Sequence, residues 1–231
     1  MRFKIYFIEG EHVAVSFDGK LLVINPAESV LVGGRARSAR PHTSERKSSN
    51  SGPSEQANFT GEADCAITPE RKNFVVFTGE VKESSWKVLY PSMPELEKEE
   101  DGILGLHLDE ELSVKFYVNA KVDSAFLIRQ GKFRIFYANS SYLSNVDSLE
   151  LAIRDIKKFF VRKLDFAFLP LGVETDKVTD FLSKVKPKYL IPLLPGGNPG
   201  VVEDFVKDYQ FIHTSVLLYS GNCEIFEFNL I

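Results

Sequence analysis

The residues best placed to do chemistry follow a short apolar run that ends at Pro69. Residues 65–68 have the apolar, β-branched character of a buried strand, and the proline ends that strand and opens a loop. The loop continues with Glu70, Arg71, Lys72 and Asn73. A carboxylate beside two cations could act as a general base next to groups that stabilise an oxyanion. The simpler interpretation is a surface ion pair between Glu70 and Lys72, which would contribute little to stability.

Metal-ligand spacing does not occur in the sequence. The four histidines, at positions 12, 42, 107 and 213, are far apart, and neither His-x-x-x-His nor Cys-x-x-Cys is present. A site that folding assembles from Asp64, Cys65, Glu70, Asp123 and a histidine stays open as an alternative. Cys65 lies within an apolar run, where cysteine is usually an inert small hydrophobe. We therefore predict neither a metal nor another cofactor.

The same segment resembles the metallo-β-lactamase superfamily, most closely the small bacterial and archaeal hydrolases related to ascorbate-phosphate lactonases. In that family a strand of the type A-D-x-(I/V)-L-x-T leads into H-x-H-x-D-H, which supplies most of the zinc ligands. Residues 63–68, Ala-Asp-Cys-Ala-Ile-Thr, match the strand. Pro69, Arg71 and Phe74 then stand at the histidine positions, and Asn73 stands at the aspartate position. A permanent cation such as Arg71 is the worst replacement for a zinc ligand.

Further matches to the family also lack metal ligands. Residues 126–138 are similar to its internal hairpin, which normally has a zinc-binding histidine before it and a metal-bridging aspartate after it. Lys121 lies before this hairpin, and the aspartate position falls on Ser140, or on Asn139 in a register shifted by one residue. Residues 164–172 resemble the strand D-L-A-L-L-P-(I/L)-G. Residues 186–194 resemble K-P-K-x-(V/L)-I-P-M-H, with Leu194 in place of the final histidine.

The resemblance implies an α/β fold, a four-layer αββα sandwich with two mixed β-sheets, helices on both outer faces and the site at one edge. It covers nearly the whole chain, so residues 1–231 are expected to form one domain. The lost ligands imply a pseudoenzyme, a non-catalytic binding or interaction protein. Arg71, Lys72 and Lys121, with Asn73, Asn139 and Ser140, would line an electropositive pocket for a small anionic or phosphate-bearing ligand. The alternative is a hydrolase of a phosphoester, lactone or thioester, with Glu70 as base and Arg71 or Lys121 at the oxyanion.

Composition favours an ordinary cytoplasmic protein. A chain of 231 residues with 44% hydrophobic and 26% charged residues can bury one large core. Its formal charge of -4 argues against a protein built to coat nucleic acid. Two cysteines cannot form a disulfide framework, and no apolar run approaches the roughly 20 residues of a membrane helix. The sequence names no partner and leaves a homo-oligomer undecided.

Hydrophobic periodicity predicts the elements that must position these residues. Asp147 is expected to cap a helix together with Glu150, and further helices are expected at 175–185 and from Asn198-Pro199. Residues 216–219 and 224–228 are expected to close the chain as a hairpin. The expected strands cover residues 3–8, 12–17, 21–25, 74–78, 86–90, 103–108, 113–118, 124–128, 133–137 and 164–169.

Two polar segments are expected to be solvated loops. Residues 33–61 are rich in Ser, Arg and Gly and cannot bury enough apolar surface to order themselves, so we predict a mobile loop at about these positions. Its basic residues could instead contact phosphate or nucleic acid. Residues 94–101 are acidic; a divalent-cation site is the alternative to glutamates that simply extend into water.

Overall fold

A computed structural model describes residues 2–9, 12–17, 20–24, 73–76, 87–89, 97–108, 110–118, 124–158, 163–172, 174–195, 198–209, 213–217 and 225–229. The described helices are α2 (Ser140–Leu143), α3 (Val146–Lys158), α4 (Thr175–Val185) and α5 (Gly200–Asp208). The strands are β1 (Arg2–Glu9), β2 (His12–Phe17), β3 (Lys20–Ile24), β4 (Asn73–Val76), β5 (Lys87–Leu89), β6 (Glu97–Glu100), β7 (Ile103–His107), β8 (Leu112–Val118), β9 (Ser124–Gln130), β10 (Phe133–Ala138), β11 (Phe166–Pro170), β12 (Tyr189–Leu193), β13 (Ser215–Val216) and β14 (Ile225–Asn229).

The strands form two mixed sheets. The smaller has the order β14-β1-β2-β3-β4-β5, antiparallel up to β3 and parallel from β3 to β5. The larger has the order β13-β12-β11-β10-β9-β8-β7-β6, antiparallel from β6 to β10 and parallel from β10 to β13. Two tight hairpins are present, since Phe17 pairs with Lys20 and Gln130 with Phe133. The second is the internal hairpin expected within residues 126–138. Gly131 supplies the positive φ, +54°, that the second turn requires.

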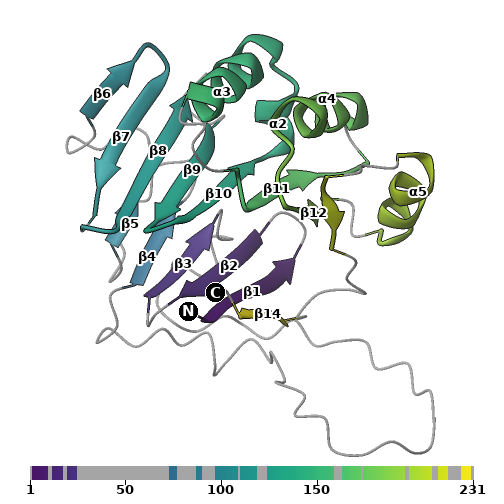
Figure 1. The fold of residues 1–231 in the computed structure, drawn as a ribbon, viewed down its shortest axis with the longest axis horizontal. Coiled ribbons are helices and arrows are strands. Elements are labelled where there is room, and N and C mark those ends of the chain that lie inside the picture. The colour runs from purple at the N-terminus through teal and green to yellow at the C-terminus, as the bar shows by residue number, and fades with distance from the viewer. Residues whose placement is uncertain are drawn as a thin grey trace, which may run out of the picture.

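The two sheets lie face to face (Figure 1). Aromatic side chains pack between them. Phe3 of β1 stacks on Phe166 of β11 with ring centroids 4.7 Å apart. Phe228 of β14 meets the Phe166 ring edge-on at 5.2 Å. Phe3 and Phe166 are fully buried. Each such pair contributes about 0.5 to 1.5 kcal/mol beyond the burial of its area.

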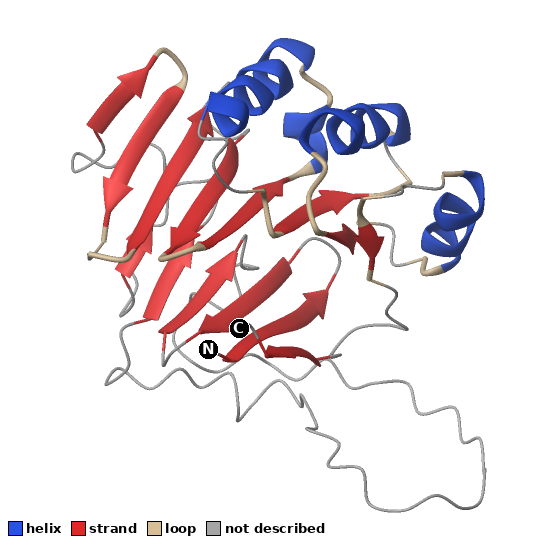
Figure 2. Cartoon of the chain, in the orientation of Figure 1, coloured by secondary structure: helices blue, strands red, loops and turns tan. Residues whose placement is uncertain are grey.

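The described helices lie on the side of the larger sheet, and Figure 2 shows α3 and α4 over its outer face. Phe136 of β10 stacks on Phe181 of α4 at 4.9 Å, which fixes α4 on that face. The α3 and α4 sequences are amphipathic, and each buries its apolar stripe on the sheet. The predicted order of layers is thus confirmed for this part of the sandwich: the smaller sheet, the larger sheet and a layer of helices on the larger sheet. No described segment forms a helix on the outer face of the smaller sheet.

The predicted closing hairpin is wrong. β13 pairs parallel with β12 at the edge of the larger sheet, whereas β14 pairs antiparallel with β1 in the smaller sheet (Figure 1). The two strands therefore lie in different sheets. The aromatic contacts of Phe228 explain the outcome. When β14 pairs with β1, the Phe228 ring packs against the rings of Phe3 and Phe166.

Two local predictions also need correction. Helix α3 begins at Val146, whereas a cap at Asp147 would have started it at residue 148. The side-chain oxygen of Asn145 accepts a hydrogen bond from the amide of Ser148 at 3.0 Å. Asn145 is therefore the cap, and Asp147 lies in the first turn. The acidic segment is not a plain loop, because residues 97–100 form β6 at the edge of the larger sheet. Residues 33–61 lie outside the described residues.

Candidate functional site

Three neighbouring parallel strands of the larger sheet, β10, β11 and β12, end at one edge of the sandwich. β10 ends at Ala138, and β11 and β12 run beside it in the same direction. The residues that follow these strands, Asn139 after β10 and Leu194 after β12, therefore lie at a common edge, as the resemblance predicts. The main-chain amide of Leu171, after β11, donates to the carbonyl of Leu193 at 2.9 Å and ties this edge together.

Asn139 has a structural task at this edge. Its side-chain oxygen accepts a hydrogen bond from the amide of Tyr142 at 2.9 Å, so it caps helix α2. The side chain is 9% exposed. Ser140 is the first residue of α2, and its carbonyl accepts from the hydroxyl of Ser144 at 3.1 Å. The position of the family's bridging aspartate is thus held by a helix cap or by the helix start.

Leu194, at the position of the final histidine in the family pattern, is a buried apolar side chain. The side chain is 5% exposed and belongs to the hydrophobic core. A leucine has no atom that can coordinate a metal. Its burial shows that this place is packed and not solvated.

Asn73 and Phe74 do not lie in a loop. They open β4, which pairs parallel with β3 in the register of Leu21 with Asn73 and Leu22 with Phe74. The strand expected at 74–78 is thus present as β4, and only the prediction that the loop includes Asn73 is wrong, because Asn73 pairs as the first residue of that strand. Pro69, Glu70, Arg71, Lys72 and Lys121 lie outside the described residues.

The sequence on either side of β4 offers no metal ligands of the kind that the resemblance leads one to expect. In the sequence, neither residues 69–72 before β4 nor residues 77–86 after it contain a histidine or a cysteine. Among the described residues, no group of three or more His, Cys, Asp or Glu side chains could hold a metal ion. The residues at the two positions described above, an amide used as a cap and a buried leucine, do not fit a zinc centre.

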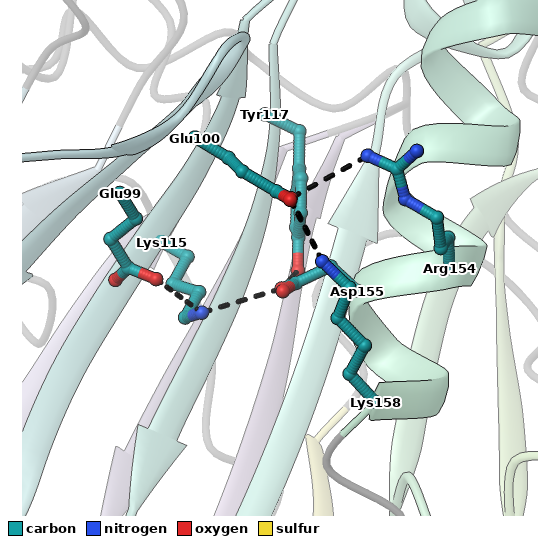
Figure 3. Close-up of polar contacts among 7 residues, drawn as sticks. All are labelled: Glu99, Glu100, Lys115, Tyr117, Arg154, Asp155 and Lys158. Atoms are coloured by element: carbon teal, nitrogen blue, oxygen red, sulfur yellow. Dashed lines mark hydrogen bonds and ion pairs between the residues drawn. The ribbon is translucent and has the colours of Figure 1, made fainter.

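A charged cluster that the sequence did not reveal lies on the outer face of the larger sheet, under α3 (Figure 3). The hydroxyl of Tyr117 in β8 donates to the carboxylate of Asp155 in α3 at 2.7 Å, and both side chains are buried. Lys115 Nζ lies 3.4 Å from the same carboxylate oxygen and 2.5 Å from Glu99 Oε2. Burial, and next the charge of Asp155, raise the pKa of Tyr117 well above its ordinary value.

The cluster extends at the surface to the edge strand β6. Glu100 pairs with Lys158 at 2.8 Å and with Arg154 at 3.5 Å. The hydrogen bond from Lys158 lowers the pKa of Glu100. The expectation that these glutamates simply extend into water is therefore wrong, because Glu99 and Glu100 hold β6 against β8 and α3. The signal in the sequence was Asp155, a carboxylate on the apolar stripe of α3 between Ala152 and Ile156.

Comparison with solved structures decides the fold. The metallo hydrolase Igni18 from the hyperthermophilic archaeon Ignicoccus hospitalis is similar over 100% of both chains, with a TM-score of 0.57 and 10% identity. The metallo-β-lactamase fold protein YhfI from Bacillus subtilis has a TM-score of 0.53 and 8% identity over 98% of this chain and 99% of that one. The chain has the metallo-β-lactamase fold.

An isothiocyanate hydrolase from Delia radicum gut bacteria has the same arrangement. Its TM-score is 0.55 at 8% identity, over 96% of this chain and 98% of that chain. No family model and no curated protein matches the sequence. The metallo-β-lactamase fold is thus shared at sequence identities of about one residue in ten. No described helix is long and apolar enough to cross a membrane.

Proposed function

We propose that this chain is a metallo-β-lactamase-fold pseudoenzyme that has lost its metal site and binds a small anionic or phosphate-bearing ligand in the former metal pocket. The main support comes from two residues at the edge of the larger sheet. There Leu194 is buried hydrocarbon, and the Asn139 oxygen caps α2. Neither side chain is thus available to ligate a metal ion. Without that ion there is no metal-bound hydroxide to act as the nucleophile in metal-assisted hydrolysis.

The ligand class follows from charge. The resemblance assigns three cations to this pocket, Arg71, Lys72 and Lys121. Guanidinium pairs bidentately with phosphate. Asn73, Asn139 and Ser140 are the polar residues assigned beside them. These cationic and polar side chains could bind an anion directly, without a metal ion between the anion and the protein.

The test is metal content and phosphate binding in the full chain. Elemental analysis of purified protein is expected to find zinc, iron and manganese far below one atom per chain. Calorimetric titration with inorganic phosphate is expected to show binding that the double variant Arg71→Gln, Lys72→Gln loses. A stoichiometric transition metal in the purified protein would falsify the proposal.

The chain supplies its own matched control for this experiment. Glu45-Arg46-Lys47 repeats the sequence of Glu70-Arg71-Lys72 at positions that the resemblance does not assign to the pocket. The variant Arg46→Gln, Lys47→Gln removes the same charges in the same local sequence. If it weakens phosphate binding as much as the pocket variant does, the effect is one of net charge and the pocket assignment is wrong.

A second candidate is a metal-independent hydrolase, favoured by the hydrolases among the similar structures. Glu70 would act as general base, and Arg71 or Lys121 would stabilise the oxyanion. Turnover of a phosphodiester, a lactone or a thioester in the presence of chelator is the assay. Glu70→Gln should abolish turnover while Glu45→Gln should not, and equal rates in both variants exclude this candidate.

A further inference from the structure

Strand β6 forms one edge of the larger sheet and contributes no apolar side chain to the core. Its residues are Glu97, Lys98, Glu99 and Glu100; the first three are exposed and Glu100 is partly buried. Burial of apolar surface is the main force that holds most elements in a fold. β6 must be held in another way. Main-chain pairing with β7 is one attachment, and the ion pairs of its glutamates are the other.

A β-bulge in β6 turns two consecutive glutamates toward the same face of the sheet. Lys98 pairs with Leu104 and Glu100 pairs with Ile103, so Glu99 is the extra residue between them. Successive side chains of a regular strand point to opposite faces, and a bulge breaks that alternation locally. Figure 3 shows both carboxylates on the side of the sheet that faces α3. The bulge therefore gives β6 two charged contacts on that side.

Glu100 connects the edge strand to the end of α3. The Nζ atom of Lys158 lies 2.8 Å from one carboxylate oxygen of Glu100 and 3.1 Å from the other. The guanidinium of Arg154 lies 3.5 Å from Glu100 Oε2. These three side chains are largely accessible to solvent. Ion pairs between exposed groups are weak and are screened by salt, so this connection depends on ionic strength.

Glu99 reaches across the neighbouring strand β7 to Lys115 of β8. Its Oε2 atom lies 2.5 Å from Lys115 Nζ. The side chain passes over Gly105, where an added Cβ would overlap Glu99 Oε1. Gly105 does not have a positive φ, so its backbone does not require glycine. A glycine inside a strand often marks a place where another group approaches closely, and here that group is the Glu99 carboxylate.

The Glu99 side chain is also part of the wall of a cavity of about 240 Å³. Lys115 lines the same cavity, together with the apolar side chains of Leu127, Ile156 and Leu164. The Lys115 side chain is 18% exposed. The ion pair that attaches β6 to β8 therefore also holds one wall of the cavity in place.

We propose that β6 is a salt-sensitive strap, which the Glu99–Lys115 and Glu100–Lys158 ion pairs fasten to the outer face of the larger sheet and whose release opens the cavity beside Lys115. The Debye length falls from about 10 Å at 0.1 M salt to about 3 Å at 1 M, which weakens exposed ion pairs. The apolar contacts of the strands inside the sheet persist under these conditions, so β6 opens locally while the sheet stays folded. This inference goes beyond the proposed function, because it concerns neither the former metal pocket nor its ligand.

Hydrogen exchange of the full chain, read by mass spectrometry at about 0.1 M and about 1 M sodium chloride, tests the release. Amides of β6 are expected to exchange about threefold or more faster at the higher salt concentration, because two sets of exposed ion pairs are screened. Amides of β8 are expected to exchange at the same rate in both. Unchanged exchange in β6, or an equal increase in β8, would overturn the proposal.

Two single variants of the strap separate the ion pair from net charge. Glu100→Gln should speed exchange of β6 in low salt by about twofold or more and reduce its response to added salt. Glu97→Gln is the matched control, because it removes the same charge from the same strand, and Glu97 forms no ion pair within the described part of the chain. It should leave the exchange of β6 as in the native chain. Equal effects of both variants would assign the effect to net charge and refute the strap.

Gly105→Ala tests the Glu99 contact without changing any charge. The added methyl group must displace the Glu99 carboxylate from its path to Lys115. Alanine is less costly than glycine inside a strand, so the thermal midpoint should not fall and faster exchange cannot be ascribed to global unfolding. Amides of β6 should exchange about threefold or more faster in low salt, as local opening becomes more frequent.

The same variant shows whether release opens the cavity. Lys115 should react with an acetylating reagent about threefold or more faster than in the native chain, in step with the opening of β6. Lys132, an exposed residue of the turn between β9 and β10, is the internal reference and should react at an unchanged rate. Native rates of exchange in β6 or of acetylation at Lys115 would overturn the proposal.

Discussion

The hydroxyl oxygen of Tyr117 lies 2.7 Å from the carboxylate of Asp155, with both side chains buried between the larger sheet and α3. A buried carboxylate is costly unless its oxygens are hydrogen-bonded and its charge is balanced. Tyr117 meets the first need, and Lys115, at 3.4 Å, meets the second. This contact fixes α3 on β8.

Tyr117→Phe should lower the free energy of unfolding by about 1.5 to 3 kcal/mol, the range for a hydrogen bond to a charged partner. Tyr142→Phe is the comparison, because the buried Tyr142 hydroxyl donates to a neutral carbonyl, that of Ser148, at 2.6 Å. Its expected cost is about 0.5 to 1.5 kcal/mol. Urea unfolding of both variants measures the difference. Equal costs would mean that the charge of Asp155 adds nothing.

Stability should decline as pH rises above about 10, the ordinary pKa of tyrosine. Burial, and next the charge of Asp155, raise the pKa of Tyr117, so the folded chain keeps a proton that the unfolded chain releases. Above that pH the unfolded state binds fewer protons, and the free energy of unfolding decreases. Urea midpoints measured between about pH 8 and 11 should fall less steeply for Tyr117→Phe than for the native chain. Parallel slopes would contradict the assignment.

Variants of Asn139 can test whether its side chain serves to cap helix α2 or to bind a ligand. Asn139→Ala should cost about 1 kcal/mol, because the amide of Tyr142 loses its partner, whereas Asn139→Asp should stay within a few tenths, since aspartate caps equally well. Thermal unfolding without added ligand reports both values. A neutral Asn139→Ala would indicate that the side chain is retained for binding, as the sequence predicted, and not for the helix.

The fold was largely predictable because its elements carry strong local signals. Thr175–Val185 has the apolar period of a helix and is blocked by Pro187, and its bounds are as predicted. His12–Phe17 is also as predicted. The closing hairpin failed because pairing is not local. Residues 216 and 225 are near in sequence, yet the rings around Phe228 draw β14 into the other sheet.

The candidate site was less predictable for the same reason. A motif match fixed Leu194 at the sheet edge, but the buried role of that leucine and the capping role of Asn139 depend on neighbours far along the chain. Asp155 was visible as a carboxylate on an apolar helix face. Its partners Tyr117 and Lys115 lie about forty residues away on β8, and no spacing rule connects them.

Leu194→His restores the imidazole that the family pattern places here, and it should not restore zinc binding. The side chain is 5% exposed, so an imidazole without partners should destabilise the chain by about 1 to 3 kcal/mol. Zinc would offset this cost only if other ligands held it, since stabilisation requires binding to the folded state. Leu194→Asn is the control for polarity without strong metal affinity. Thermal midpoints of both variants should be equally low with zinc and with chelator. A zinc-dependent rise for Leu194→His alone would show that two or more further ligands survive around the former site, and the loss of the metal centre would then rest on this one side chain.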